Sequence, residues 1–205
     1  MFAKHTNWYL FMSKALNTRY NILQKAFALV YKQGYQATSI DDIIATTQVT
    51  KGAFFYHFKS KDQMGLAMIN EVMNPGMVEV LINPLLSSQG AVSEIYDMMH
   101  NILLRSPFFD IKYGCPAVNL IDEMSAVNEQ FNKALFRLFK QWQDAIQATI
   151  AKAVELGKVK EGVNAQQVAY FVMAGYSGIR NMGKLLGVAC YKSYLKELKI
   201  YLNHL

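Results

Sequence analysis

Cysteine, histidine and proline are scarce in this chain of 205 residues, which has two cysteines, four histidines and four prolines. Cys115 and Cys190 lie far apart, and no Cys-x-x-Cys pair or Cys/His cluster occurs, so the sequence indicates neither a disulfide framework nor a metal site. We expect no cofactor. No apolar run approaches the roughly 18 residues of a transmembrane helix, and the first residues lack the apolar core of a secretory signal. These absences favour a protein of the reducing cytoplasm.

Residue patterns typical of enzymes are also missing. The four histidines are widely separated: His5, His57, His100 and His204. There is no Gly-x-Ser-x-Gly motif and no phosphate-binding glycine loop. The carboxylate pairs Asp41-Asp42 and Asp122-Glu123 are adjacent in sequence, so on a helix the two members of each pair point in different directions. We therefore predict that the chain is not an enzyme.

Positive charge and apolar residues are what the sequence does have. Hydrophobic residues make up 52% of the chain, enough for a substantial core. The formal net charge is +6, and it is uneven: residues 1–62 carry eight Lys or Arg against three Asp or Glu, whereas the remainder is close to balanced. A basic end joined to a nearly neutral remainder is typical of a nucleic-acid-binding domain followed by another domain.

Residues 40–59 have the pattern of a helix-turn-helix. Ser39 is placed to cap a first helix, and Asp41 and Asp42 in its first turn offset the positive end of the helix dipole. Thr50 is placed to cap a second helix after a break at residues 47–49. The second helix is short, which is typical of an element that reads the DNA major groove.

The second helix has an apolar face and an opposite face whose residues can contact DNA. Phe54 and Phe58 are four residues apart and face the core. Small residues let the backbone come close to a duplex, while hydroxyls, rings and cations hold phosphates or reach base edges. For His57 the alternative is a solvated residue at a helix end. The DNA-binding candidates are Thr38, Thr50, Lys51, Gly52, Ala53, Tyr56, His57 and Lys59.

At these residues the chain resembles the tetracycline-repressor (TetR) family of bacterial transcription regulators. The matching strings include Gly34-Tyr35-x-Ala37-Thr38-Ser39-Ile40 and Val49-Thr50-Lys51-Gly52-Ala53-Phe54-Phe55-Tyr56-His57-Phe58. The resemblance implies an all-α fold with a three-helix DNA-binding domain and a helical domain for ligand binding and dimerisation. It also implies a homodimer that binds a palindromic DNA operator and is released by a small-molecule effector.

Two residues depart from the family pattern. Gln48 stands in the turn where family members often have glycine, so we expect a left-handed backbone there. Phe55 replaces a frequent tyrosine and has no hydroxyl to offer a phosphate.

We predict three parts of the chain: an N-terminal extension at 1–17, the helix-turn-helix domain at 18–62, and the ligand-binding and dimerisation domain at 63–205. Within the extension, Met12 is a candidate for the physiological start; the alternative is an extra helical turn packed on the domain. A helix that begins at Lys61 is predicted to be interrupted by Pro75-Gly76. Residues 128–156 are predicted to form one long amphipathic helix.

Two further sets of residues are candidates for sites in the second domain. Glycines in the helix predicted at 165–186 suggest close helix approach, here across a dimer axis, although a core helix is the alternative. The interface candidates are Phe171, Gly175, Tyr176, Gly178, Ile179 and Met182. The ligand-pocket candidates are Tyr113, Cys115, Asn119, Phe139 and Trp142.

Cys115 raises an alternative function. It lies near a predicted helix N-terminus, where a thiolate is favoured, and the surrounding Gly-Cys…Asn…Glu pattern resembles a branch of the family with members that sense electrophiles. A repressor that responds to redox chemistry through Cys115 is thus one alternative; a buried, inert cysteine is the simpler interpretation. A DNA-binding or interaction protein that responds to no ligand is a further alternative.

Overall fold

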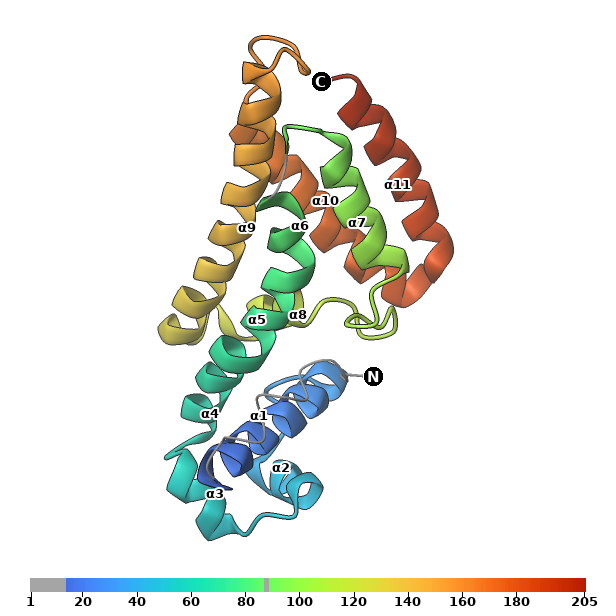
Figure 1. Cartoon of the computed structure of the whole chain (residues 1–205). Helices are drawn as coiled ribbons and strands as arrows, with labels where there is room; N and C mark the ends of the chain where they lie inside the picture. The colour runs from blue at the N-terminus through green and yellow to red at the C-terminus, as the bar shows by residue number, and fades with distance from the viewer. Residues whose placement is uncertain (1–13, 87–88) are drawn as a thin grey trace. The chain divides into compact units, whose positions relative to one another are not determined.

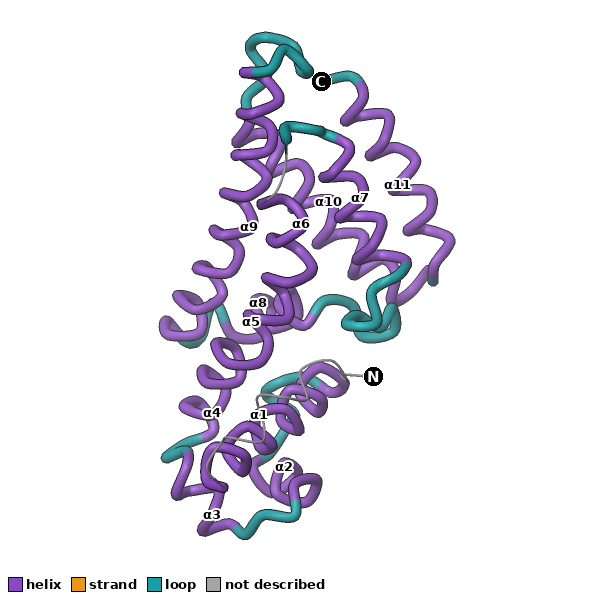
Figure 2. Tube along the Cα trace, viewed as in Figure 1, coloured by secondary structure: helices purple, strands orange, loops and turns teal. Residues whose placement is uncertain are grey.

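The computed structural model describes residues 14–86 and 89–205, and all regular structure in these ranges is helical (Figure 2). The all-α prediction is confirmed, and the proposed start at Met12 lies outside the described residues. The α-helices are α1 (Lys14–Gln33), α2 (Ile40–Thr47), α3 (Lys51–His57), α4 (Lys61–Met68), α5 (Asn74–Met77), α6 (Asn83–Leu86), α7 (Ser93–Leu104), α8 (Pro116–Met124), α9 (Glu129–Glu155), α10 (Ala165–Leu186) and α11 (Val188–Asn203).

The chain forms two compact units. The first contains residues up to Pro75 together with Asn119–Ala134, and the second contains Gly76–Val118 and Leu135–Leu205. The division does not follow a single cut in the sequence, because the end of α8 and the start of α9 pack with the N-terminal helices.

The N-terminal helices of the first unit form a small bundle in which α1 packs against α2 and α4 (Figure 1). Leu23 of α1, Ile43 of α2 and Phe54 of α3 are fully buried and form its centre. Each of the three helices therefore contributes a residue of its apolar face to one shared core.

Side-chain caps fix where the short helices begin. Ser39 Oγ accepts from the backbone N–H of Asp42 at 3.0 Å, while Asp42 accepts from the Ser39 N–H, which completes a capping box. Thr50 caps α3 by accepting from Ala53 N at 3.1 Å, and Ser60 caps α4. Between α2 and α3, Gln48 has a φ of 57°. The predicted caps and the left-handed turn are confirmed.

The predicted interruption at Pro75-Gly76 is wrong. Helical structure continues from Lys61 to Leu86, because two π-helical segments, Ile69–Met73 and Val78–Ile82, each precede an Asn-Pro pair. Asn74 N–H bonds to Ile69 O and Asn83 N–H to Val78 O, five residues back in each case. The wider turn accommodates the proline ring and its missing donor without ending the helix.

The same segments explain an apolar repeat of four residues. Ile69, Met73, Met77, Leu81 and Leu85 are all buried. In a regular α-helix, positions four apart drift around the axis by about 40° per step, so five of them would leave one face. The wider π-turns reverse that drift and keep the five side chains on the buried side.

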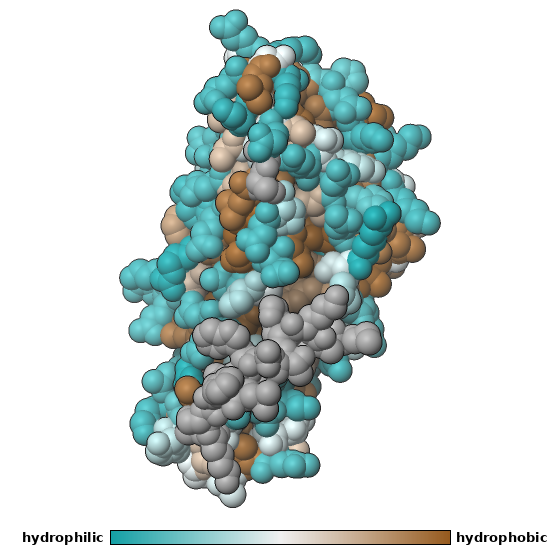
Figure 3. Space-filling model, viewed as in Figure 1, coloured by the Kyte–Doolittle hydropathy of each residue, from teal (hydrophilic) through white to brown (hydrophobic). Residues whose placement is uncertain are grey.

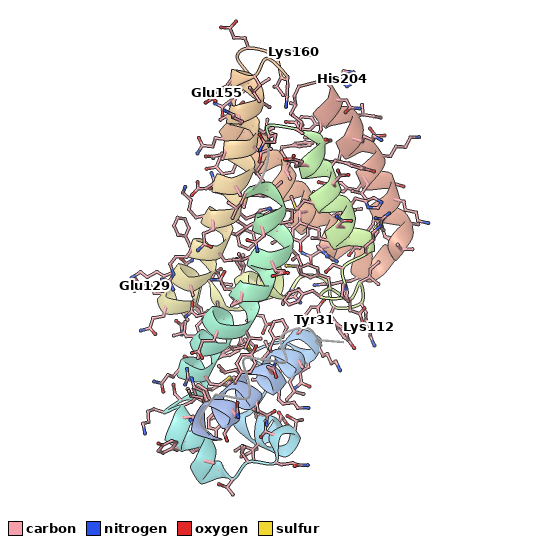
Figure 4. All side chains as sticks on the ribbon, in the orientation of Figure 1. Tyr31, Lys112, Glu129, Glu155, Lys160 and His204 are labelled. Carbon is pink, nitrogen blue, oxygen red and sulfur yellow. The ribbon has the colours of Figure 1, made fainter. Side chains whose placement is uncertain are left out.

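The second unit is built from the long helices. Helix α7 lies between α6 and α11, and α11 also packs against α10 (Figure 1). At one end, the loop that follows α9 is tied to the C-terminal end of α11, as Figure 4 shows for Lys160 and His204. Lys160 Nζ donates to the His204 carbonyl at 2.6 Å, and Lys160 N donates to the Leu205 carbonyl at 2.9 Å.

Candidate nucleic-acid interface

Helix α3 presents one buried side and one open side. Phe54 is fully buried, whereas Tyr56 is 74% exposed. Gly52 is exposed, and a Cβ built there would meet only Thr50 Oγ1, at 3.9 Å. Ala53 is half-buried beside it. The N-terminal half of α3 therefore has a smooth backbone surface that a duplex could approach closely.

Two exposed lysines flank this surface. Lys51 Nζ lies 3.2 Å from Asp41 Oδ1, but both side chains are well exposed, so this ion pair is weak and Lys51 can exchange it for another partner. Lys59 Nζ donates to the Phe55 carbonyl at 3.4 Å near the other end of α3. Thr50 uses its oxygen as the cap and still carries a hydroxyl hydrogen that can be donated.

Arg19 supports α3 from α1. Its Cζ lies 4.5 Å from the centroid of the Phe58 ring, and its Nη1 is 3.5 Å from the His57 carbonyl at the end of the helix. Its Nε also donates to Glu71 Oε2 at 3.2 Å. These contacts place a cation where the helix dipole is negative. The sequence alone does not indicate this role of Arg19, because its partners are 38 to 52 residues away.

His57 packs edge-on against Tyr56, with ring centroids 5.0 Å apart. Partial burial, and secondarily the charge of Arg19, lower the pKa of His57 below its usual value. The ring is therefore largely neutral at neutral pH and offers a single N–H donor beside the exposed phenol.

Thr38 occupies a different environment from the other candidates. Its side chain is fully buried, and its hydroxyl donates to the Gly34 carbonyl at 2.6 Å. Because this hydroxyl is not available to a phosphate in this structure, we leave Thr38 out of the proposed surface. We define the α3 surface as Thr50, Lys51, Gly52, Ala53, Tyr56, His57 and Lys59.

Residues 119–134, although distant in sequence, contact the helix-turn-helix and help to hold it in place. Gln36 N donates to Glu123 Oε2 at 3.0 Å, and Gln36 Nε2 donates to the Glu123 carbonyl at 3.1 Å. The Tyr35 and Phe131 rings lie 4.9 Å apart. The turn between α1 and α2 is thus attached to the part of the chain that joins α8 and α9.

The predicted ligand-pocket residues lie in several different environments. Cys115 and Trp142 are buried in the second unit, and Phe139 packs against Trp142 with ring centroids 6.3 Å apart. Tyr113 is half-buried with Lys112 Nζ 5.4 Å from its ring, and Asn119 belongs to the other unit. Tyr176, which was predicted at the dimer interface, instead meets Trp142 edge-on at 5.1 Å and interacts with Cys115.

The interface prediction for α10 needs revision. Tyr176 and Ile179 are buried within the protomer, and Gly175 makes room for the ring of Tyr194 on α11, which a Cβ would strike. An exposed apolar stripe follows a neighbouring track along α10, and hydrophobic atoms also reach the surface near the start of α11 (Figure 3). We define the α10 stripe as Phe171, Ala174, Gly178, Met182 and Leu185.

The part of the chain that the structure describes contains no group of three or more His, Cys, Asp or Glu side chains able to hold a metal ion. It also contains no helix long and apolar enough to cross a bilayer.

Comparisons with known proteins agree with this geometry. Residues 22–68 match the family described as "Bacterial regulatory proteins, tetR family", and residues 91–194 match "Tetracyclin repressor-like, C-terminal domain". An HTH-type transcriptional regulator in the lacX 3' region of Lactococcus lactis is 33% identical over 162 residues, 79% of this chain and 81% of that protein. The HTH-type transcriptional repressor DhaR of a Mycobacterium species is 23% identical over 78% of this chain and 79% of its own.

The fold comparison gives the same result. A TetR-family transcriptional regulator from Cytophaga hutchinsonii superposes with a TM-score of 0.80, covering 93% of this chain and 96% of that one at 20% identity. Together with the two matched domains and the Lactococcus relative, this likeness establishes that the chain belongs to the TetR family of bacterial transcription regulators.

Proposed function

We propose that this chain is a cytoplasmic transcriptional repressor that binds a palindromic DNA operator as a homodimer and is released by a small-molecule effector. The observation that carries the proposal is the α3 surface. It combines an accessible backbone at Gly52, exposed cations at both ends and an exposed phenol, all on a helix anchored by Phe54. The proposal assigns the chain no catalytic role and no cofactor.

In this proposal the α3 surface contacts DNA in two ways. Lys51 and Thr50, at the N-terminus of α3, read base edges in the major groove. Tyr56, His57 and Lys59 contact phosphates and set the register of the helix on the duplex. The close backbone approach at Gly52 brings the first group within reach.

The α10 stripe supports the homodimer. Its members recur at intervals of three or four residues, and Leu185 is 88% exposed in the protomer. A continuous apolar face on a long helix is a typical contact between subunits. Two copies joined there would present two recognition helices, and an operator with half-sites about 34 Å apart would bind both.

Release by an effector requires differential binding. A molecule that binds the second unit equally well in DNA-competent and DNA-incompetent states would shift nothing, so the effector must prefer the incompetent state. The relative DhaR is named a repressor, and the same direction of control is proposed here.

Selection of bound duplexes from a random pool, using the full-length protein, tests the proposal. We expect an inverted repeat with half-sites one helical turn apart, protected over both halves in a footprint. A metabolite screen on the selected duplex should then identify compounds that release it. Recovery of no consensus sequence, or a consensus without two-fold symmetry, would contradict the proposal; affinity unaffected by all metabolites would favour the ligand-independent alternative.

The redox alternative has one observation in its favour: Cys115 lies in a buried polar cluster with Tyr176 and Arg180. Its full burial works against direct attack by an oxidant. If oxidants or alkylating agents release the operator and Cys115→Ser abolishes that release, the alternative holds.

A further inference from the structure

Arg180 is a buried cation in the C-terminal third of α10. Only 1% of the residue is exposed. Its guanidinium is surrounded by aromatic rings, with Cζ 4.3 Å from the centroid of Phe109, 5.3 Å from Tyr176 and 5.5 Å from Tyr191. Aromatic faces attract a cation, but they do not replace the hydrogen bonds that water would make with it.

The hydrogen bonds of Arg180 are incomplete. Nη2 donates to the Ile102 carbonyl, and Nη1 lies 3.4 Å from the Tyr191 hydroxyl, but Nε has no partner. No carboxylate lies within ion-pair distance of Arg180 among the residues that the structure describes. Buried charges in proteins are normally paired, so a negatively charged partner is missing here.

Neighbouring side chains add further hydrogen-bond donors. Trp142 Nε1 is buried without a hydrogen-bond partner, and the rings of Trp142 and Tyr176 meet at 5.1 Å. Burial first, and then the neighbouring Cys115, raise the pKa of Tyr176, so its hydroxyl keeps its proton. Burial opposes the charge of Arg180, but Tyr176, Tyr191 and Cys115 outweigh it and raise the pKa of the guanidinium. The cluster is rich in donors and holds a full positive charge.

A pocket of about 380 Å³ leads to this charge. Its wall is formed by the end of α7 and the following loop, by Arg180 of α10 and by Val188 of α11. The apolar residues of the lining include Leu104, Phe109 and Ile111. Asp110 is also in the wall, but its Oδ1 accepts from Lys112 N at 2.8 Å, and the residue is exposed.

We infer that this pocket binds a small organic carboxylate, with the negative group against the Arg180 guanidinium and the hydrocarbon part against Leu104, Phe109 and Ile111. A guanidinium suits a carboxylate because it can donate parallel hydrogen bonds to both oxygens. Only the further step, that such an acid is the effector, rests on the proposed function.

Thermal unfolding of the full chain with matched acids and amides tests this inference. Hexanoate and benzoate should raise the melting temperature in a concentration-dependent manner at constant ionic strength, whereas hexanamide and benzamide should not. Titration calorimetry with the acid that protects best then gives its Kd. Absence of protection by every monocarboxylate, or equal protection by the amides, would overturn the inference.

Three variants locate the site. Arg180→Met should weaken binding of that acid by about thirtyfold or more, because it removes one partner of a buried charge pair. Arg137→Met, which removes an exposed arginine on α9, should bind it as the unmodified chain does. Ile111→Trp should block the pocket with Arg180 intact, so it decides the matter if Arg180→Met does not fold. Unchanged affinity in Ile111→Trp, or in a folded Arg180→Met, would refute the site.

An operator-release assay with the same acids separates this inference from the proposed function. Acids that bind through Arg180 and release the operator support both. Binding without release leaves the pocket assignment in place and removes only the effector role. A chain that binds these acids but selects no operator refutes the proposed function alone.

Discussion

The Tyr35 hydroxyl donates a 2.7 Å hydrogen bond to Asp62 Oδ1 within the first unit. Asn128 Nδ2 donates to the second oxygen of the same carboxylate at 3.1 Å. Asp62 lies in the first turn of α4, Tyr35 in the loop after α1 and Asn128 immediately before α9. One carboxylate therefore ties together three segments that meet behind the helix-turn-helix.

We expect Tyr35→Phe to lower the free energy of unfolding by about 1–2 kcal/mol, because it removes the charge-assisted hydrogen bond from the buried Tyr35 to the Asp62 carboxylate. Chemical denaturation at a fixed protomer concentration measures this loss. Tyr56→Phe removes a hydroxyl from an exposed ring and should change the unfolding free energy by less than about 0.5 kcal/mol. Equal effects of the two substitutions would show that the bond to Asp62 contributes nothing specific.

Substitution of the two lysines of the α3 surface, Lys51 and Lys59, should affect DNA binding in different ways. Lys51→Ala should alter sequence preference, because Lys51 is placed to read a base, with a loss of about 1–3 kcal/mol on the selected operator and little on random duplex. Lys59→Ala should weaken binding to all duplexes alike and reduce the slope of log K against log salt by about 1. Anisotropy titrations at several salt concentrations measure both. Parallel losses of Lys51→Ala on operator and random duplex would remove its base-reading role.

Operator affinity should rise as the pH falls from 8 to 6. The lowered pKa of His57 in the free protein leaves the ring largely neutral, whereas a phosphate beside it would favour the imidazolium and raise its pKa in the complex. Binding would then take up protons, by at most about one, which corresponds to at most about tenfold in affinity per pH unit.

His57→Gln should flatten this pH dependence while leaving a neutral donor in place. Titrations at constant ionic strength over that pH range measure it. A lowered pKa also means that protonation of His57 weakens the free fold below about pH 6.5, so folding at each pH serves as the control. A pH dependence of the same slope in His57→Gln would exclude the phosphate contact.

Leu185→Arg should convert the proposed homodimer to monomers. The side chain is exposed in the protomer, so the fold should tolerate arginine, but a two-fold interface through the α10 stripe would contain the new charge twice. Sedimentation velocity measures the change, and operator affinity should fall with it. Phe136→Arg, at a 64% exposed position on α9, is the matched control and should stay dimeric. Dimers in both variants would place the interface elsewhere.

Gly175 and Gly178 should respond oppositely to alanine. At Gly175 a Cβ would strike the ring of Tyr194, so we expect a loss of about 1–3 kcal/mol in unfolding free energy. At Gly178 nothing in the same protomer lies within 4 Å, so in the Leu185→Arg background, where no partner helix should meet it, alanine should stabilise the helix by about 0.5–1 kcal/mol. Thermal or urea unfolding at a fixed protomer concentration measures both, and destabilisation by Gly178→Ala would contradict this assignment.

Local signals in the sequence predicted the recognition module well. Ser39 and Thr50 cap the helices that they were expected to cap, and Gln48 has the left-handed backbone that the resemblance to the TetR family implied. These features depend on interactions within three or four residues, which a sequence displays directly.

Features that depend on distant partners could not be predicted in the same way. Pro75 predicted a break in the helix, because proline lacks a backbone N–H donor. The π-helical turn that accommodates it is a change in backbone conformation that no side-chain pattern in the sequence indicates. Gly175 was expected to face a partner helix, although its neighbour is Tyr194 of the same chain. The sequence does not indicate that Arg180 is buried, because an arginine within a helix is usually exposed and its contacts with Phe109 and Ile102 span more than 70 residues.

The π-helical segments Ile69–Met73 and Val78–Ile82 have a consequence for local opening of the backbone. Bonds that close over five residues have poorer geometry than those of the flanking α-helical turns, so these turns should be the first of the Lys61–Leu86 run to exchange their amide protons with solvent. The two prolines therefore do not end this helical run, but they mark the places where its backbone should open most readily.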